Sequence, residues 1–306
     1  MKRALILLLI VSLSIIACGG AALGEADPAS MSAEALLQAG KDAEAGEDYG
    51  KAMEYYQQAA DQGDAEAVWS IGALYYSGYG VEQDYARALE YFQKAADLGN
   101  ARALNSVGHM YLEGYGVEKD YEKAMDYIQR AVDLDVPAAR YNMGYIYLYG
   151  IGVDVDYAKA LEYYQKAADQ GYKDAQYSTG CMYHIGMGVE PDYEVALKYY
   201  QLAVDQGDAG ACNNIGDMYE NGNAVEQDYA KAMEYYQRAV DLGEPYGYCS
   251  IGSLYAKGLG VEQDYEKAAE YYRKGAELGV EDALDYLKEL VEAGHVSGDY
   301  LEGLGE

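Results

Sequence analysis

The dipeptide Asp-Tyr returns in this chain at a constant step of 36 residues, at Asp48, Asp84, Asp120, Asp156, Asp192, Asp228 and Asp264. Glycine keeps the same step from Gly72 to Gly252, and alanine keeps it from Ala52 to Ala268. A fixed period of this length is typical of solenoids, in which every repeat packs only on its neighbours. The period therefore predicts an array of similar structural units.

Each unit is predicted to consist of two helices and a short polar joint. Residues 64–77 place small and apolar side chains at helical spacing on one stripe. Gly78 ends this segment, because glycine tolerates the positive φ of a helix C-terminus. Asp84 then predicts the N-cap of a second helix, where its carboxylate accepts free N–H groups. The phrase GVEQDY, at 80–85 and again at 260–265, is therefore interpreted as a joint and not as a binding site.

These features resemble the Sel-one-like repeat family, which is close to the tetratricopeptide repeats. Residues 67–99, with the sequence AVWSIGALYYSGYGVEQDYARALEYFQKAADLG, carry the resemblance nearly whole, and it extends over six units from about Asp64 to Gly279. The resemblance implies an all-α fold, namely a right-handed α-solenoid of 36-residue helix-turn-helix repeats. It also implies that the protein is a non-catalytic scaffold for protein complexes.

The two ends of the array depart from this pattern. The first unit has a shorter joint, and the last helix, 280–293, carries Lys288 in place of the repeated glycine. Because the ends of a solenoid need polar outer faces, both units are predicted to be caps. We expect residues 31–294 to form the solenoid, with about seven helical pairs and a capping helix, and residues 295–306 to form an acidic, mobile tail.

The N-terminus is predicted to be a targeting segment. Lys2 and Arg3 precede 13 nearly apolar residues, 4–16, which are fewer than the roughly 20 that a membrane-spanning helix needs. The following Ile-Ile-Ala-Cys resembles the bacterial lipobox. That resemblance implies a lipoprotein signal peptide at 1–17, acylation of Cys18, and a flexible tether at 18–30. The protein would then be extracytoplasmic and lipid-anchored to a bacterial membrane; ordinary secretion is the alternative.

The formal charge of the chain is −30, which excludes most nucleic-acid binders, because phosphates require a basic surface. The same charge disfavours binding to anionic membrane surfaces, so membrane contact is expected through the lipid only. A partner attracted by charge would be basic. We expect the solenoid itself to be a monomer.

The tetratricopeptide-like pattern implies that the first helix of each unit lines a concave groove. Carried over residue by residue, the groove positions are Glu66, Trp69, Ala73 and Tyr76 and their equivalents every 36 residues. These positions vary between units while the structural columns repeat, as a binding surface requires. The candidate binding residues are Trp69, Tyr76, Arg102, Asn105, Tyr141, Tyr145, Tyr177, Asp217 and Glu220. We expect a protein or peptide to bind there; a glycan on the aromatic side chains is the alternative.

Three further possibilities involve the cysteines. Cys181 and His184 could converge with Asp217 and Glu220 on a metal, or act as nucleophile and base of a thiol-dependent hydrolase. The spacing matches no standard zinc motif, so no metal, cofactor or enzymatic activity is expected. Cys212 and Cys249 lie 37 residues apart, and whether they form a disulfide is left open.

Overall fold

The computed structural model describes residues 31–304. The predicted signal peptide, Cys18 and the tether up to residue 30 lie outside the described residues. Within 31–304 the chain folds into fifteen α-helices and one short 3-10 helix. Their bounds are α1 (Ala33–Ala45), α2 (Tyr49–Asp61), α3 (Ala65–Ser77), α4 (Tyr85–Asp97), α5 (Ala101–Glu113), α6 (Tyr121–Asp133), α7 (Pro137–Tyr149), α8 (Tyr157–Asp169), α9 (Lys173–Ile185), α10 (Tyr193–Asp205), α11 (Ala209–Asn221), α12 (Tyr229–Asp241), α13 (Tyr246–Lys257), α14 (Tyr265–Glu277), α15 (Glu281–Glu292) and η2 (Gly298–Leu301).

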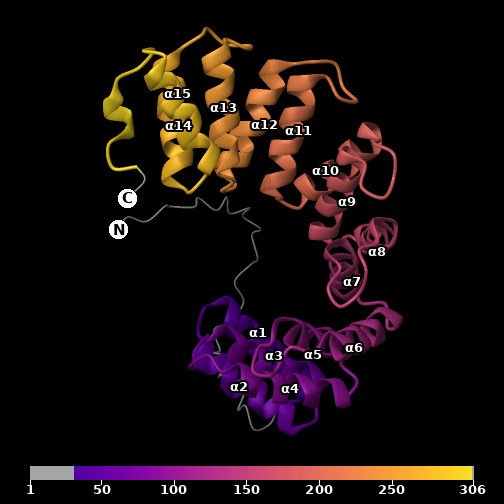
Figure 1. The fold of residues 1–306 in the computed structure, drawn as a ribbon. Helices are drawn as coiled ribbons and strands as arrows, with labels where there is room; N and C mark the ends of the chain where they lie inside the picture. Colours follow the sequence, from indigo (N-terminus) through magenta and orange to yellow (C-terminus); the bar gives the residue numbers. More distant parts are fainter. Residues whose placement is uncertain (1–30, 305–306) are drawn as a thin grey trace, which may run out of the picture.

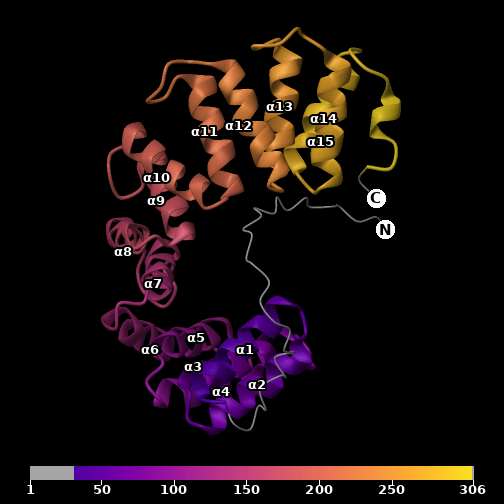
Figure 2. The ribbon, with the colours of Figure 1, turned by 180° about the vertical axis from the view of Figure 1, so that it is seen from behind.

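The helices pack side by side in chain order along a curved array (Figure 1). The view from behind shows the same arrangement, with the arm of α1 to α6 facing the arm of α11 to α15 across an open side (Figure 2). The closest packing is between the two helices of a pair, and adjacent pairs contact one another next. The prediction of an all-α solenoid of paired helices at 36-residue spacing is confirmed. No helix within residues 31–304 combines the length and apolar character of a membrane span.

The repeated aspartate caps every second helix, as the sequence predicts. Asp84 Oδ1 accepts a hydrogen bond from the backbone N–H of Arg87 at 3.0 Å. The same bond recurs at α2, α6, α8, α10, α12 and α14. The Asp84 N–H in turn donates to the carbonyl of Tyr75 at 3.0 Å, which ties the joint back to the first helix. The repeated phrase is therefore a structural joint.

The joint also fixes how one repeat sits on the repeat before it. Gly80 has a φ of 70° and lies against Tyr49, so that a Cβ at position 80 would come within 2.6 Å of the Tyr49 Cβ. The preceding residue, Tyr79, stacks on Tyr49 with ring centroids 4.9 Å apart. The same stack joins Tyr85 to Tyr115 at 4.6 Å. Glycine is thus required here both for its backbone conformation and for its lack of a side chain.

Most of the 37 tyrosines are structural. Within each pair from α3/α4 to α13/α14, one tyrosine of each helix stacks on the other, as Tyr75 does on Tyr91 at 5.7 Å. A second set is fully buried over the repeated glycine. A Cβ at Gly216, for example, would lie 2.5 Å from the Tyr236 ring. Aromatic rings therefore fill the space between the two helices of a pair, where glycine leaves room for them.

The C-terminal segment, which we predicted to be mobile, instead packs on the last repeat. The Arg273 guanidinium donates to the carbonyls of Tyr300 at 2.9 Å and of Glu302 at 3.0 Å. The Tyr300 hydroxyl donates to Glu266 at 2.7 Å, and Val296 is buried. His295 stacks on Tyr265 at 3.9 Å, as the joint residues of earlier repeats do on their tyrosines. Residues 295–304 therefore pack against α14, in the place where the next repeat packs on the earlier second helices.

Candidate functional site

The predicted groove positions lie on the first helix of each pair. In the lower arm of Figure 1, α1, α3 and α5 are on the inner side of the array, with α2 and α4 outside them. We call the four positions headed by Glu66, Trp69, Ala73 and Tyr76, with their equivalents on the later first helices, the groove columns. A cavity of about 740 Å³ opens on these columns between α11, α13 and α15. The columns of successive repeats therefore do line a common hollow at the C-terminal end.

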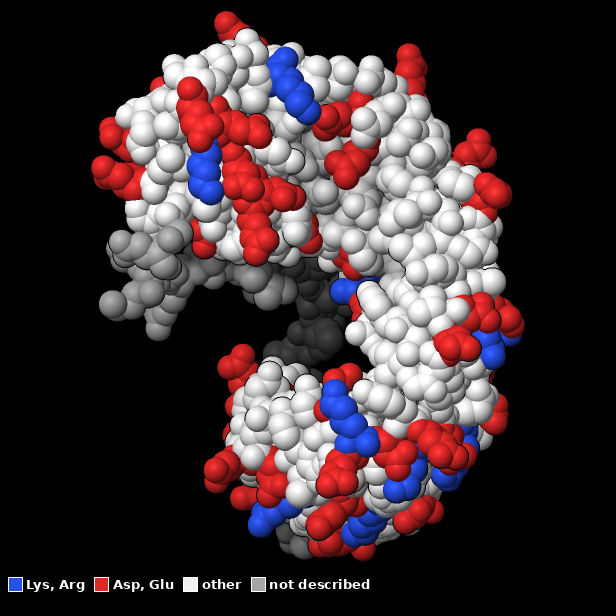
Figure 3. Space-filling model, in the orientation of Figure 1, with Lys and Arg blue, Asp and Glu red and all other residues white. Residues whose placement is uncertain are grey.

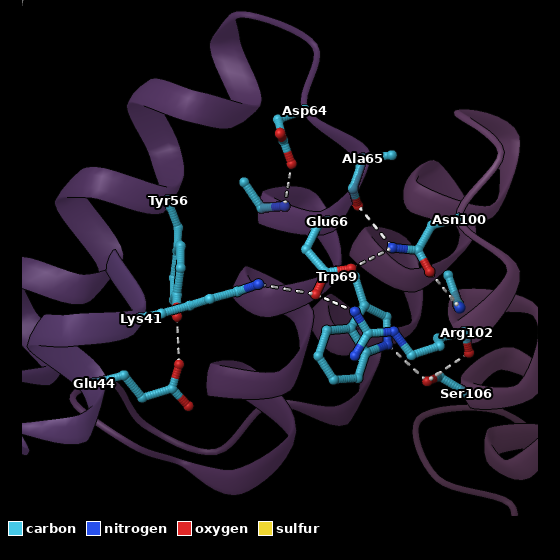
Figure 4. A network of polar contacts seen from close by, with 12 residues as sticks. Lys41, Glu44, Tyr56, Asp64, Ala65, Glu66, Trp69, Asn100, Arg102 and Ser106 are labelled. Atoms are coloured by element: carbon cyan, nitrogen blue, oxygen red, sulfur yellow. Dashed lines mark hydrogen bonds and ion pairs between the residues drawn. The ribbon is translucent and has the colours of Figure 1, made fainter. Parts of the chain in front are cut away.

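Polar contacts between repeats occupy the N-terminal part of the groove (Figure 4). Trp69 Nε1 donates to Ser106 Oγ at 2.9 Å, and the Arg102 guanidinium lies 5.0 Å from the Trp69 ring. Arg102 is also paired with Glu66, whose carboxylate receives Lys41 Nζ at 3.5 Å. Trp69 and Arg102 thus contact one another and the neighbouring repeat. Both side chains are therefore already engaged in contacts within the protein.

The hydrogen bond between Trp69 and Ser106 is one of several that join the first helices of successive repeats. The Asn142 amide donates to Asn105 Oδ1 at 2.8 Å, and the Ser250 hydroxyl donates to Asn213 Oδ1 at 3.2 Å. Each of these bonds joins residues 37 positions apart, from one repeat to the next. Part of the variation in the groove columns is therefore explained by matched polar pairs between repeats, and Asn105 is such a pairing residue.

Two predicted aromatic residues are packed into clusters. Tyr76 lies against Tyr85 at 5.4 Å and Tyr115 at 5.9 Å, beside His109. Burial lowers the pKa of His109. Tyr141 is half-buried between Tyr164 at 5.3 Å and Tyr172 at 5.4 Å. These rings form the wall of the groove, and only part of each is available to a ligand.

A pair of exposed, neighbouring tyrosines lies in the middle of the array. Tyr145 is 37% exposed and its neighbour Tyr149 is 61% exposed, with ring centroids 4.6 Å apart. Ile185, which is the equivalent of Tyr149 on the next first helix, is 63% exposed. The sequence analysis identified Tyr145 but missed Tyr149 and Ile185, because they stand one position beyond the groove columns. We call these three residues the central apolar patch.

Tyr177, Cys181 and His184 extend along α9 beside this patch. The Tyr177 ring packs 6.1 Å from Tyr200. The Cys181 thiol receives a hydrogen bond from the Asn214 amide at 3.7 Å, and His184 Nδ1 lies 3.4 Å from the Tyr200 hydroxyl. Burial raises the pKa of Cys181 and lowers that of His184. Both groups therefore have other partners and are held neutral, an arrangement unlike an activated thiolate and its base.

Asp217 and Glu220 both contact a single buried tyrosine, Tyr236. The Tyr236 hydroxyl lies 2.7 Å from Asp217 Oδ1 and 2.8 Å from Glu220 Oε2. One hydroxyl can donate only one proton, so the two carboxylates compete for it. Burial raises the pKa of Asp217; the Tyr236 bond opposes this and the Glu220 charge adds to it. Both carboxylates line the cavity between α11, α13 and α15.

The cysteine possibilities are not supported by this geometry. Within residues 31–304, no three His, Cys, Asp or Glu side chains gather as ligands for a metal ion. Cys181 and His184 therefore do not converge with Asp217 and Glu220. Cys212 and Cys249 are buried free thiols, and burial raises the pKa of Cys249 to about 11.

The sequence analysis also missed the acidic face of α15. Asp282, Asp285, Glu289 and Glu292 stand 216 residues after Glu66, Trp69, Ala73 and Tyr76, six full periods on, and so occupy all four groove columns. Acidic side chains gather over the α13 to α15 end of the molecule in Figure 3. Continuing the 36-residue columns into the capping helix would have identified them.

Comparisons with known proteins agree with this architecture. The Sel1 repeat matches the chain seven times, at residues 32–64, 65–100, 101–136, 137–172, 173–208, 209–244 and 245–280. The first unit, which the sequence analysis set apart for its short joint, is thus one of the seven. A search of curated proteins gave no match.

Two solved structures resemble the chain along most of its length. A Sel1 repeat protein from Oxalobacter formigenes is 30% identical with a TM-score of 0.72, and the match covers 79% of this chain and 99% of that one. A protective antigen present in uropathogenic Escherichia coli strains, which displays an SLR fold, is 30% identical with a TM-score of 0.69. That match covers 85% of this chain and 57% of the antigen, so the chain spans little more than half of the antigen's length.

Proposed function

The chain belongs to the Sel1 repeat family, and on this premise we propose that it is a non-catalytic scaffold that binds a partner protein in its groove. The observation that carries the proposal is the central apolar patch. Tyr145, Tyr149 and Ile185 expose apolar side chains at neighbouring positions on two successive first helices, and Tyr149 and Ile185 are 61% and 63% exposed. Exposed apolar clusters rimmed by polar residues typically mark protein interaction sites. Rigid tyrosines also give contact area at a low cost in side-chain entropy.

A protein ligand suits this patch better than a glycan does. The rings of Tyr145 and Tyr149 are inclined at 51° to one another, so they do not form a flat platform for a sugar ring. Within the described residues, Cys181 and His184 are the side chains closest in type to a hydrolytic pair, and each is hydrogen-bonded elsewhere. These contacts support a binding role for the groove without catalysis.

The test is capture of envelope proteins by the full chain in detergent, compared with the variant Tyr145→Ser/Tyr149→Ser/Ile185→Ser. The control is Leu134→Ser/Leu242→Ser/Leu278→Ser, which removes three exposed leucines at the C-termini of second helices. We expect a captured protein to be lost with the first variant and kept with the control. Equal capture by all three chains would contradict the proposal, and retention of peptidoglycan alone would favour the glycan alternative.

We further propose that the scaffold acts outside the cytoplasm, held to a bacterial membrane by acylated Cys18. The support is the sequence alone: a short basic start, 13 nearly apolar residues and the lipobox-like Ile-Ile-Ala-Cys. Mass spectrometry of the mature N-terminus is expected to find Cys18 as the first residue, carrying lipid. The variant Cys18→Ser should be released from the membrane fraction, and an unmodified N-terminus beyond Cys18 would instead support ordinary secretion.

A further inference from the structure

The groove has a charge asymmetry along its length. On α3, α5 and α7 the groove columns carry one acid and one base, Glu66 and Arg102, which pair with each other. From α9 to α15 the same columns contain no Lys or Arg, and they contain seven acidic residues: Asp174, Asp217, Glu220, Asp282, Asp285, Glu289 and Glu292. Among the described residues, only Asp285 of these seven forms an ion pair, with Lys288 at 3.1 Å. The C-terminal end of the groove is therefore strongly negative while its N-terminal end is balanced.

The cavity between α11, α13 and α15 lies within this acidic region. Its apolar lining includes the rings of Tyr177 and Tyr272 and the side chain of Leu290. Asp217, Glu220, Glu244, Asp282 and Glu289 also line it, against the single base Lys257. A concave surface with both apolar walls and several carboxylates suits a side chain that has an aliphatic stem and a cationic head.

Two further tyrosines stand at the edge of this cavity. Tyr246 on α13 is 56% exposed, and Tyr286 on α15 is 42% exposed. Both are on the groove side of their helices, beside Asp282 and Glu289 in the lining. Tyrosine faces attract lysine and arginine heads, and they do so more strongly where water is partly excluded. No further first helix packs on the groove side of α15 within the described residues.

We propose that this cavity binds lysine or arginine side chains of an extended basic segment in the partner protein. The proposal rests on the proposed function, because it assigns the C-terminal end of the same groove to the basic part of that partner. The carboxylates attract the cationic heads, and the tyrosines and Leu290 contact the stems. At the other end of the groove Glu66 and Arg102 neutralise each other and do not attract a cationic segment. The partner is therefore held in one direction along the groove.

The test uses a fluorescein-labelled octalysine peptide and the full chain in detergent, with binding followed by fluorescence anisotropy. The variant Asp282→Asn/Asp285→Asn/Glu289→Gln/Glu292→Gln removes the α15 carboxylates. The matched control, Glu54→Gln/Glu90→Gln/Glu234→Gln/Glu270→Gln, changes the net charge equally on the exposed outer column of four second helices. We expect the Kd to rise at least tenfold with the α15 variant and less than twofold with the control, at 150 mM salt. At that salt concentration, charges beyond about 8 Å are screened.

A charge-reversed variant guards against loss of folding. Asp282→Lys/Glu289→Lys is expected to lose octalysine and to gain binding of labelled octaglutamate, which an unfolded α15 would not do. Equal weakening by the α15 variant and the control would overturn the proposal, since the peptide would then sense only net charge. Displacement of octalysine by millimolar Ca²⁺ to the same extent in the intact chain and both variants would overturn it as well.

This experiment separates the two proposals. If octalysine binding is unaffected by the α15 variant while the central apolar patch is needed to capture a protein, the basic-segment proposal fails and the scaffold function stands. If the patch variant captures every protein that the intact chain does, the scaffold function fails whatever octalysine does.

Discussion

Ala224 shows what a single residue contributes to the joint between repeats. It has a φ of 58°, in the left-handed region, at a position that is glycine in the five equivalent joints: Gly80, Gly116, Gly152, Gly188 and Gly260. A non-glycine residue in that region costs about 1–2 kcal/mol. The preceding residue, Asn223, also replaces the tyrosine that stacks on the previous repeat at Tyr79 and Tyr115.

Replacing Ala224 by Gly is therefore expected to stabilise the protein. The strain removed exceeds the extra freedom that glycine gives the unfolded chain, which is worth about 0.4–1 kcal/mol. We expect a net gain of about 0.5–1 kcal/mol in the free energy of unfolding, measured by urea titration. The reciprocal change Gly260→Ala should destabilise the protein, because the new Cβ would come within 2.6 Å of the Tyr229 Cβ. A lower free energy of unfolding in Ala224→Gly would contradict the inference that Ala224 is strained.

Asp217 should make stability depend on pH. Its folded-state pKa is raised, mainly by burial, so the folded state keeps the proton at pH values where the unfolded chain has released it. Ionisation of Asp217 then destabilises the fold as the pH rises from the unfolded pKa through the folded pKa. We expect Asp217→Asn to be more stable than the natural chain at pH 7, with a difference that shrinks as the pH falls toward 4. Urea midpoints from pH 4 to 8 test this; a constant difference would refute it, and Glu90→Gln is the control.

At the scale of elements, the second helices depend on their aspartate caps. Asp84→Ala removes the acceptor for the Arg87 N–H and is expected to cost about 1 kcal/mol in the free energy of unfolding. Because position 84 belongs to the joint, capture of the partner protein should be unchanged. Loss of capture without loss of stability would show that the joint is itself a binding site.

The packing of the C-terminal segment depends on one residue, Arg273, that differs from its equivalents in the earlier repeats. Position 273 is arginine where Gln57, Gln93, Gln129, Gln165, Gln201 and Gln237 precede it. In four of the earlier repeats this glutamine is hydrogen-bonded to a tyrosine of the next repeat, as Gln93 is to the Tyr127 hydroxyl at 2.6 Å. Arg273 instead binds the carbonyls of the C-terminal segment, those of Asp299, Tyr300 and Glu302.

Arg273→Gln is therefore expected to release residues 295–304 without unfolding the repeats. Amide hydrogen exchange should speed up in this segment and at the exposed face of α14, while α1 to α10 keep their protection. The matched control is Lys274→Gln, which removes a neighbouring charge that lies over Tyr271. Unchanged exchange at 295–304 in Arg273→Gln would show that Val296 and Tyr300 hold the segment without the arginine.

Across the whole molecule, the centre of the array is the most polar part of the core. Gln176 and Thr179 on α9 take positions held by Val68 and Ile71 on α3, and the buried Thr179 hydroxyl has no hydrogen-bond partner in the described chain. Gln206, which bonds to Gln176 at 2.8 Å, stands where α4 has Leu98 at its end. One repeat earlier the equivalent residues, Arg140 and Gln170, are also hydrogen-bonded to each other. Repeats that exchange apolar contacts for hydrogen bonds are expected to open more easily.

Gln176→Val/Thr179→Ile/Gln206→Leu transfers the residues of the second repeat to the centre. It is expected to raise stability and to slow amide exchange in α8 and α9, with little change in α3 and α4. Because a solenoid's stability is the sum of its repeats and their interfaces, the gain should remain local. Faster exchange in α8 and α9 would show instead that the polar pairs pack better than their apolar counterparts.

The sequence by itself determined the repeat, because a 36-residue period in glycine, aspartate and tyrosine is visible without any long-range information. It also placed Asp217 and Glu220 on one face of a single helix, since residues three apart on an α-helix are neighbours. Only the tertiary structure decided which groove residues are available. Trp69, Arg102 and Asn105 are engaged with the next repeat, and Tyr149 and Ile185 are exposed, because availability depends on what the adjacent repeat presents. The packing of residues 295–304 could not be predicted for the same reason. Arg273 stands in a column of glutamines, and only the structure shows that the carbonyls of Tyr300 and Glu302 accept its hydrogen bonds.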